Sequence, residues 1–226
     1  MLNSWHGAAG RDRLAAVLPL LICLALLFGG LAGGVVLGGV MPLPYGPAAQ
    51  VLAYVRAEPV AVQVIATCVF ASSVPLAVYA AVTAARLRRL DVAPVAATVA
   101  LVGGTLAAGA LGLTGLLGWT LSRPEVGADP ALVRAIYFLV FLIGGPGHIA
   151  ALGVQIAAIA MPGLAMRLLS RPLAWLGLSI AALAELTTLV LAWPELGVIL
   201  PIARVAGLLW LLAAGALLPR VHFDAV

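Results

Sequence analysis

The chain has 226 residues, of which 64% are hydrophobic and only 9% are charged, and its formal net charge is +4 at pH 7. A soluble domain usually has about 25% charged residues, so this composition excludes an ordinary water-exposed globular domain. Several apolar runs reach the ~20 residues that an α-helix needs to cross a bilayer. These runs lack the alternating ~10-residue segments of a membrane β-barrel. The sequence therefore predicts an all-α polytopic membrane protein.

The basic residues indicate the kind of organism that encodes the chain and exclude lysine-dependent chemistry. All 12 of them are arginine, and the chain has no lysine. With so much alanine, glycine and leucine, this composition is typical of a high-GC bacterial genome, so we expect a multi-pass protein of the bacterial inner (plasma) membrane. Without lysine, the chain cannot form the Schiff base of a retinal or pyridoxal protein. Because no soluble basic patch is present, we expect no nucleic-acid partner.

The apolar runs predict one domain, residues 1–226, made of six transmembrane helices. We expect these helices at about residues 14–40, 60–85, 92–121, 130–161, 173–193 and 197–218. The first run continues without a small-residue cleavage site, which favours a retained helix over a signal peptide. Within it, Gly30, Gly34 and Gly38 recur every four residues, a spacing that lets two membrane helices approach closely.

The arginines also predict the topology. With the N-terminus inside, eight arginines are cytoplasmic and four are not. The cytoplasmic set is Arg11, Arg13, Arg86, Arg88, Arg89, Arg167, Arg171 and Arg220. The other set is Arg56, Arg123, Arg134 and Arg204. This asymmetry follows the positive-inside rule and predicts that both termini are cytoplasmic, with Trp119, Trp193 and the hairpin at Pro194 near the external face.

The fourth predicted helix contains the most unusual residues. Arg134, Phe141, His148 and Gln155 are each seven residues apart, so an unbroken helix would place them on one face. Gly-Gly-Pro-Gly precedes His148, and Pro146 removes one backbone hydrogen bond. We therefore expect a kinked helix whose polar stripe faces its neighbours.

Two charged residues lie deep in the last two helices. Glu185 and Arg204 are nearly equidistant from the hairpin at Pro194, and antiparallel helices would bring them to the same depth. A charge at that depth is costly unless it has a partner, so we expect an ion pair. The pair is compatible with a structural role, and a proton or cation site is the alternative.

His148 also has two interpretations. Its imidazole can donate a hydrogen bond to a carbonyl that the Pro146 kink releases, or it can titrate or bind a metal or haem. No second histidine lies within a predicted helix, because His6 and His222 are terminal. Cys23 and Cys68 lie in separate apolar runs without metal-ligand spacing. We therefore expect no metal site, and the sequence identifies no cofactor.

The C-terminal half resembles a known group of sequences. The resemblance rests on Gly-Trp-x-Leu-Ser-Arg-Pro (118–124), Phe-Leu-x-Gly-Gly-Pro-Gly-His (141–148), Arg-Pro-Leu-Ala-Trp-Leu-Gly (171–177) and a segment at 201–215. These motifs are similar to those of uncharacterised multi-pass bacterial membrane proteins with a domain of unknown function. The resemblance implies a bundle of about six helices and no particular activity.

No catalytic motif is present, so we expect no catalytic residues and no enzyme. The short loops and glycine-rich helices favour an accessory, assembly or binding subunit within the membrane, which would contact the lipid bilayer and other subunits or a second copy of itself. The alternative is a small-solute or proton-coupled transporter that uses Glu185, Arg204 and His148. The candidate binding residues are His148, Glu185, Arg204, Arg134 and Gln155.

Overall fold

The computed structural model describes the backbone of residues 2–219 and the side chains of residues 17–219. The predictions that involve the side chains of His6, Arg11, Arg13, Arg220 and His222 lie outside this range. Within it, every regular element is a helix, and six helices are long and apolar enough to cross a membrane. The predicted all-α membrane fold is therefore confirmed.

The helices follow one another with short connections. They are α1 (Leu2–Gly38), α2 (Ala48–Ala57), α3 (Pro59–Arg89), α4 (Pro94–Leu121), α5 (Pro124–Gly127), α6 (Pro130–Leu142), the π-helix η1 (Ile143–Gly147), α7 (His148–Ala165), α8 (Arg171–Leu186), the 3₁₀ helices η2 (Thr187–Leu191) and η3 (Pro194–Val198), and α9 (Ile199–Leu217). Proline stands in the first turn of α3, α4, α6 and α8, where its missing N–H group has no helical acceptor anyway. At α6, the Asp129 side chain also caps the backbone N–H groups of Ala131 and Leu132.

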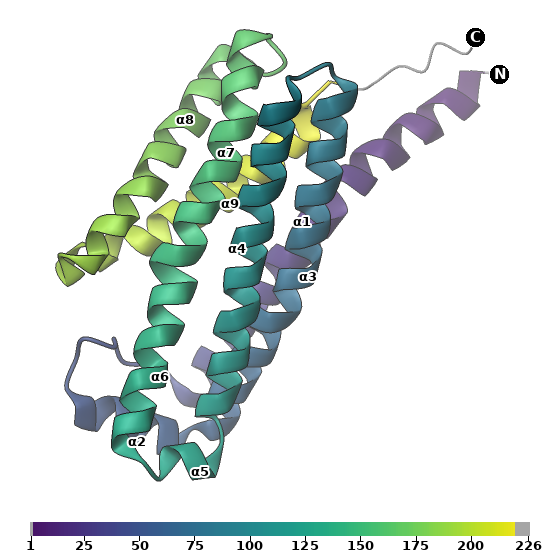
Figure 1. Cartoon of the computed structure of the whole chain (residues 1–226). Coiled ribbons are helices and arrows are strands. Elements are labelled where there is room, and N and C mark those ends of the chain that lie inside the picture. Colours follow the sequence, from purple (N-terminus) through teal and green to yellow (C-terminus); the bar gives the residue numbers. More distant parts are fainter. Residues whose placement is uncertain (1, 220–226) are drawn as a thin grey trace.

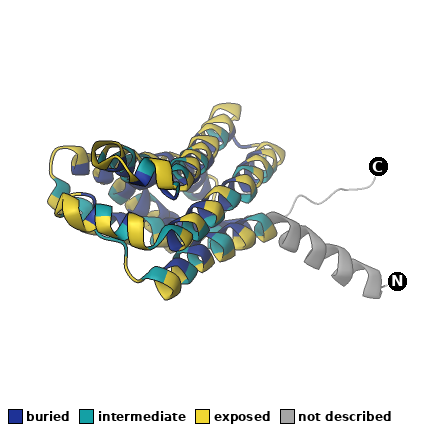
Figure 2. Cartoon of the chain, turned by 90° about the horizontal axis from the view of Figure 1, so that it is seen from below, coloured by how far each residue is buried: buried dark blue, intermediate teal, exposed yellow. Residues whose placement is uncertain are grey.

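The long helices pack side by side into one bundle (Figure 1). Helix α4 lies between α3 and α7, α1 packs on α3, and α8 packs on α7. Their buried faces point into the bundle and their exposed faces point outward (Figure 2). Because those outward faces are largely apolar, they suit contact with lipid rather than water.

Glycine brings α1 against α3, as its spacing predicts. A Cβ atom on Gly30 would lie 2.2 Å from Cys68 Cβ, and one on Gly34 would lie 2.2 Å from Ile65 Cγ1. Real Cβ atoms do not approach so closely, so larger residues there would force the helices apart. The neighbouring Gly29 has nothing within 4 Å of its Cβ position, so only one face of the glycine-rich segment is in contact.

Helix α9 is attached to the bundle by polar contacts at its C-terminal half. The buried Tyr79 on α3 donates a hydrogen bond of 2.5 Å to the Leu211 carbonyl. The Arg86 guanidinium, also on α3, donates to the carbonyls of Gly215, Leu218 and Pro219. The last carbonyls of a helix have no partner within that helix, so Arg86 acts as a C-cap supplied by another helix.

The two ends of the bundle differ in charge. Arg86, Arg88, Arg89, Arg167 and Arg171 lie at the end of α3, just after α7 and at the start of α8, at the end of the bundle where α9 also ends (Figure 1). This grouping matches the arginine sets that the predicted topology requires. Which end faces the cytoplasm remains a prediction from the positive-inside rule.

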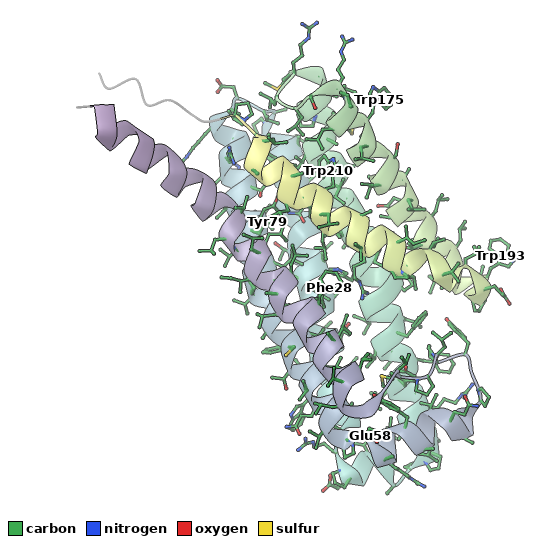
Figure 3. All side chains as sticks on the ribbon, turned by 180° about the vertical axis from the view of Figure 1, so that it is seen from behind. Phe28, Glu58, Tyr79, Trp175, Trp193 and Trp210 are labelled. Atoms are coloured by element: carbon green, nitrogen blue, oxygen red, sulfur yellow. The ribbon has the colours of Figure 1, made fainter. Side chains whose placement is uncertain are left out.

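The hairpin between α8 and α9 stops well short of the opposite end. Gly197 in this hairpin lies beside Phe141, because a Cβ atom on Gly197 would be 3.9 Å from Phe141 Cζ. Phe141 is 11 residues after Pro130, the first residue of α6, which is about 17 Å at 1.5 Å per residue. Figure 3 accordingly shows Trp193 well above Glu58, which marks that end of the bundle. The loop before α2 covers this part of α6, where Tyr45 packs edge-on against Phe138 and Phe141.

Candidate functional site

The candidate site begins at an irregular turn between α6 and α7. Residues Ile143–Gly147 form a π-helix that contains Pro146. The His148 N–H group bonds the carbonyls of Ile143 and Gly145, so the Gly144 carbonyl loses the partner that it would have in an α-helix. The proline therefore acts through a widened turn that leaves a buried carbonyl available, a feature often found at functional positions.

Arg204 on α9 uses that carbonyl. Its Nη2 group donates a hydrogen bond to the Gly144 oxygen. Its Nε atom is buried and has no partner among the described residues. Arg204 thus carries a cation into the apolar layer, where the backbone of the π-helix meets only part of its hydrogen-bonding capacity.

His148 lies next to this contact and is completely buried. Its Nδ1 atom is 2.9 Å from the Ala107 carbonyl on α4, and because a carbonyl only accepts, Nδ1 carries the proton. The predicted acceptor, a carbonyl released by the Pro146 kink, is therefore wrong: His148 binds a carbonyl of another helix, and Arg204 binds the Gly144 carbonyl that the π-helical turn releases. The remaining Nε2 atom has no partner among the described residues.

Gln155 lies two turns further along α7 and is also completely buried. It faces the junction of α3 and α4, where a Cβ atom on Gly104 would lie 2.7 Å from Gln155 Nε2 and 2.4 Å from Ala80 Cβ. Neither its amide oxygen nor its amide nitrogen has a partner among the described residues. Such buried unpartnered groups are rare in proteins, so this face of α7 carries a polar group inside an otherwise apolar interior.

The predicted polar stripe is therefore only half correct. His148 and Gln155 face α4, but Phe141 faces Tyr45 and the hairpin. Arg134 lies near the start of α6, with its guanidinium carbon 5.2 Å from the centre of the Phe138 ring. The wide turn of η1 holds one extra residue, so the helix before it is rotated by about 100° relative to the helix after it. Arg134 is consequently separate from the other candidate residues.

The predicted Glu185–Arg204 ion pair does not form. Among the described residues, Arg204 donates to the Gly144 carbonyl and no carboxylate contacts it. Glu185 lies against α7 instead, where a Cβ atom on Gly153 would be 3.1 Å from Glu185 Oε1. The reason is helix rotation: residues 187–191 form a 3₁₀ helix, which turns 120° per residue where an α-helix turns 100°. Over five residues this difference adds up to about 100°, so Glu185 faces a different direction, relative to the hairpin, from the one that an unbroken α-helix would give it.

Glu185 is exposed on the outer surface of α8. Its neighbour Gly153 is 12 residues before Ala165, the last residue of α7, which is about 18 Å along the helix. A hydrocarbon core of about 30 Å that begins at the end of α7 would therefore place the carboxylate near its middle. No described residue donates a hydrogen bond to it or forms an ion pair with it.

The residues around these groups define the chemistry available to them. Within the described part of the chain, no three His, Cys, Asp or Glu side chains lie together in a way that would hold a metal ion. Two hollows in the described part of the chain lie away from these groups, one at Arg167–Arg171 and one beside Arg56 and Arg123. The site therefore consists of hydrogen-bonding groups inside the bundle and one carboxylate on its lipid-facing surface.

The residue pattern did not point to the Gly144 carbonyl as part of the site. In an α-helix, Pro146 would leave the Leu142 carbonyl without a donor, because proline has no N–H group. The Gly144 carbonyl is released by the π-helical turn, in which the His148 N–H group bonds Ile143 and Gly145.

Comparison of the chain with family models, curated proteins and solved structures finds no match. The resemblance to uncharacterised multi-pass bacterial membrane proteins therefore stays a prediction.

Proposed function

We propose that the chain is an accessory or assembly subunit of a membrane complex and that it binds a partner transmembrane helix along the exposed face of α8. One observation carries this proposal: the Glu185 carboxylate lies near the middle of the apolar layer, faces outward, and has no hydrogen-bonding partner among the described residues. A charged group in this position costs at least ~2.5–3.5 kcal/mol. A donor on a neighbouring helix would offset that cost.

The surroundings of Glu185 support a helix as the partner. Ala182, one turn before Glu185, is exposed and small, and Leu186 and Leu189 are exposed and apolar. Small residues beside a polar group allow the close approach that membrane helices need, because apolar contact alone gives no advantage over lipid. The expected partner carries an arginine, a lysine or another hydrogen-bond donor at the depth of Glu185.

Site-directed photo-crosslinking in native membranes tests this proposal. A photoreactive amino acid at position 182 should give one defined product, whereas the same group at the exposed Val36 on α1 should give only lipid adducts. Glu185→Leu should abolish the product. A product of twice the chain's 22.9 kDa would identify a second copy as the partner. Equal products at both positions, or a product that Glu185→Leu does not change, would contradict the proposal.

The second candidate function is proton-coupled transport through Glu185, Arg204 and His148. It is supported by the buried polar atoms without partners, which are His148 Nε2, Arg204 Nε and both amide atoms of Gln155. None of these residues lines the hollows at Arg167–Arg171 or beside Arg56 and Arg123. Vesicles that contain the purified protein and an internal pH dye separate the two functions: a proton flux that His148→Leu removes would establish transport.

We also propose that both termini are cytoplasmic in a bacterial inner membrane. The arginines at the ends of α3 and α7 support this orientation, because cytoplasmic loops are enriched in basic residues. A reporter enzyme that works only in the cytoplasm should be active when it is fused after Arg88 or Arg171 and inactive when it is fused after Arg123. A reporter that works only outside the cytoplasm should give the opposite result. The reverse pattern would overturn the orientation and leave the proposed contact at Glu185 untouched.

A further inference from the structure

A positively charged hollow lies at the end of the bundle away from the chain termini. It has a volume of about 380 Å³ and is formed where α2, α3, α4 and α5 meet. Arg56 and Arg123 contribute two guanidinium groups, and no carboxylate lines the hollow. The two arginines come from segments 67 residues apart in the chain (123 − 56), so the fold creates this charge concentration.

Both guanidinium groups are held in place. Arg56 donates through Nε to the Gly127 carbonyl at 2.8 Å and through Nη2 to the Ala128 carbonyl at 3.3 Å. Arg123 lies 4.3 Å from the centre of the Trp119 ring and donates to Ser122 Oγ through Nε and Nη2. A guanidinium has five N–H donors, and each of these two groups uses two of them within the described residues. Three donors on each therefore remain for a ligand, with little conformational entropy left to lose.

The position of the hollow indicates what occupies it. Helix α3 begins at Pro59 and α4 ends at Leu121, so the hollow adjoins the ends of two membrane spans. Trp119 beside it is 44% exposed, and tryptophan concentrates at the level of lipid headgroups. The anions that are abundant at this level are phosphate groups, whose oxygens match the arginine donors.

We propose that this hollow binds the phosphate group of an anionic phospholipid, with Arg56 and Arg123 as its ligands. An anionic headgroup fits better than a zwitterionic one, because the hollow has no carboxylate to pair with a choline or ethanolamine cation. The acyl chains would extend over the exposed apolar surface of α4 next to Trp119, where Leu113 and Leu116 are more than half exposed. This site is independent of the contact proposed at Glu185.

Native mass spectrometry of the delipidated protein tests the site. Phosphatidylglycerol should bind, and Arg123→Gln combined with Arg56→Gln should weaken its binding at least about tenfold, because two sets of charge-assisted hydrogen bonds are lost. Arg134→Gln is the matched control: Arg134 lies near the same end of the bundle and over an aromatic ring, but it does not line the hollow, so binding should be unchanged. Arg56→Lys with Arg123→Lys keeps the charge without the forked donors and should give an intermediate affinity.

The remaining measurements identify the ligand. Phosphatidylcholine should bind at least about tenfold more weakly than phosphatidylglycerol, and inorganic phosphate or glycerol 3-phosphate should not displace the lipid at equal concentration. If Arg134→Gln weakens binding as much as the double variant does, the effect is general surface charge and the site is wrong. If inorganic phosphate displaces the lipid, the hollow is a soluble-anion site and the lipid proposal is wrong. Thermal unfolding without lipid shows whether the double variant still folds; if it does not, the lysine variant decides the result.

Discussion

Helices α8 and α9 each carry one charged side chain into the apolar layer, and the two are accommodated in opposite ways. Arg204 on α9 points into the bundle and binds the Gly144 carbonyl that the π-helix leaves available. Glu185 on α8 lies beside Gly153 of α7 on the exposed surface, and no described residue binds its carboxylate. The comparison shows that an irregular backbone can supply a partner within the chain, whereas a regular helix face cannot. A charge on such a face needs a partner from outside.

The largest expected effect on stability comes from a substitution inside the bundle. Gly104→Leu should lower the free energy of unfolding by about 3 kcal/mol or more. Even the first added atom, the Cβ, would lie only 2.4 Å from Ala80 Cβ and 2.7 Å from Gln155 Nε2. Gly109→Leu on the same helix should change the free energy of unfolding by less than about 0.5 kcal/mol, since nothing lies within 4 Å of that Cβ position. Reversible unfolding in mixed micelles measures both. Equal losses in the two variants would mean that α4 packs differently.

A substitution of the exposed Glu185 should have the opposite effect on stability. Glu185→Leu should raise the stability of the isolated protein in bicelles by about 2.5 kcal/mol, because it removes an unpartnered carboxylate from the apolar layer. Ala182→Leu, on the same exposed face, should change the stability by less than about 0.5 kcal/mol. A loss of stability in Glu185→Leu would show that the carboxylate has a partner within the chain.

A smaller effect is expected at His148. His148→Leu should cost about 1 kcal/mol of unfolding free energy, because it removes the hydrogen bond from Nδ1 to the Ala107 carbonyl. His148→Asn should retain most of that stability, since the amide Nδ2 group can donate from nearly the same place. The same unfolding measurement in mixed micelles compares them. If both variants lose equal stability, the hydrogen bond is not what His148 contributes.

The smallest effect is the most direct test of the missing ion pair. A double-mutant cycle with Glu185→Gln and Arg204→Leu should give a coupling energy below about 0.5 kcal/mol, because the two side chains do not touch. The sequence alone predicts a large coupling from an ion pair at matched depth. A coupling above about 1 kcal/mol would restore that pair and remove the basis for an external partner.

The fold class could be predicted from the sequence because it depends on the length of apolar runs, which is a local property. The direction in which individual side chains face could not be predicted from the sequence. Equal distance from the hairpin fixes the depth of Glu185 and Arg204, but the 3₁₀ residues 187–191 change the rotation between them. In the same way, the π-helix before His148 rotates Phe141 away from the stripe. Both departures from α-helical geometry change the direction in which residues face, and residue spacing alone does not predict that change.

For the candidate site residues, burial could be predicted from the sequence but the hydrogen-bonding partners could not. The burial of His148 and Gln155 agrees with their position in a long apolar run, and periodicity correctly places both on one face that is turned toward neighbouring helices. The acceptors could not be predicted, since His148 binds a carbonyl 41 residues away in sequence. Nothing in the sequence links Arg56 with Arg123, because the α2–α5 contact that joins them depends on tertiary packing.

The cap that Arg86 supplies to α9 has a consequence for how the protein is made. Helix α3 leaves the ribosome before α9, so Arg86 reaches the membrane when the carbonyls of Gly215 and Leu218 do not yet exist. In the proposed orientation, its charge at that stage would help to hold the loop after α3 on the cytoplasmic side. Once α9 has been synthesised, the same guanidinium binds the carbonyls at the end of that helix. In that orientation a single residue would serve first in membrane insertion and then in the packing of α9 on α3.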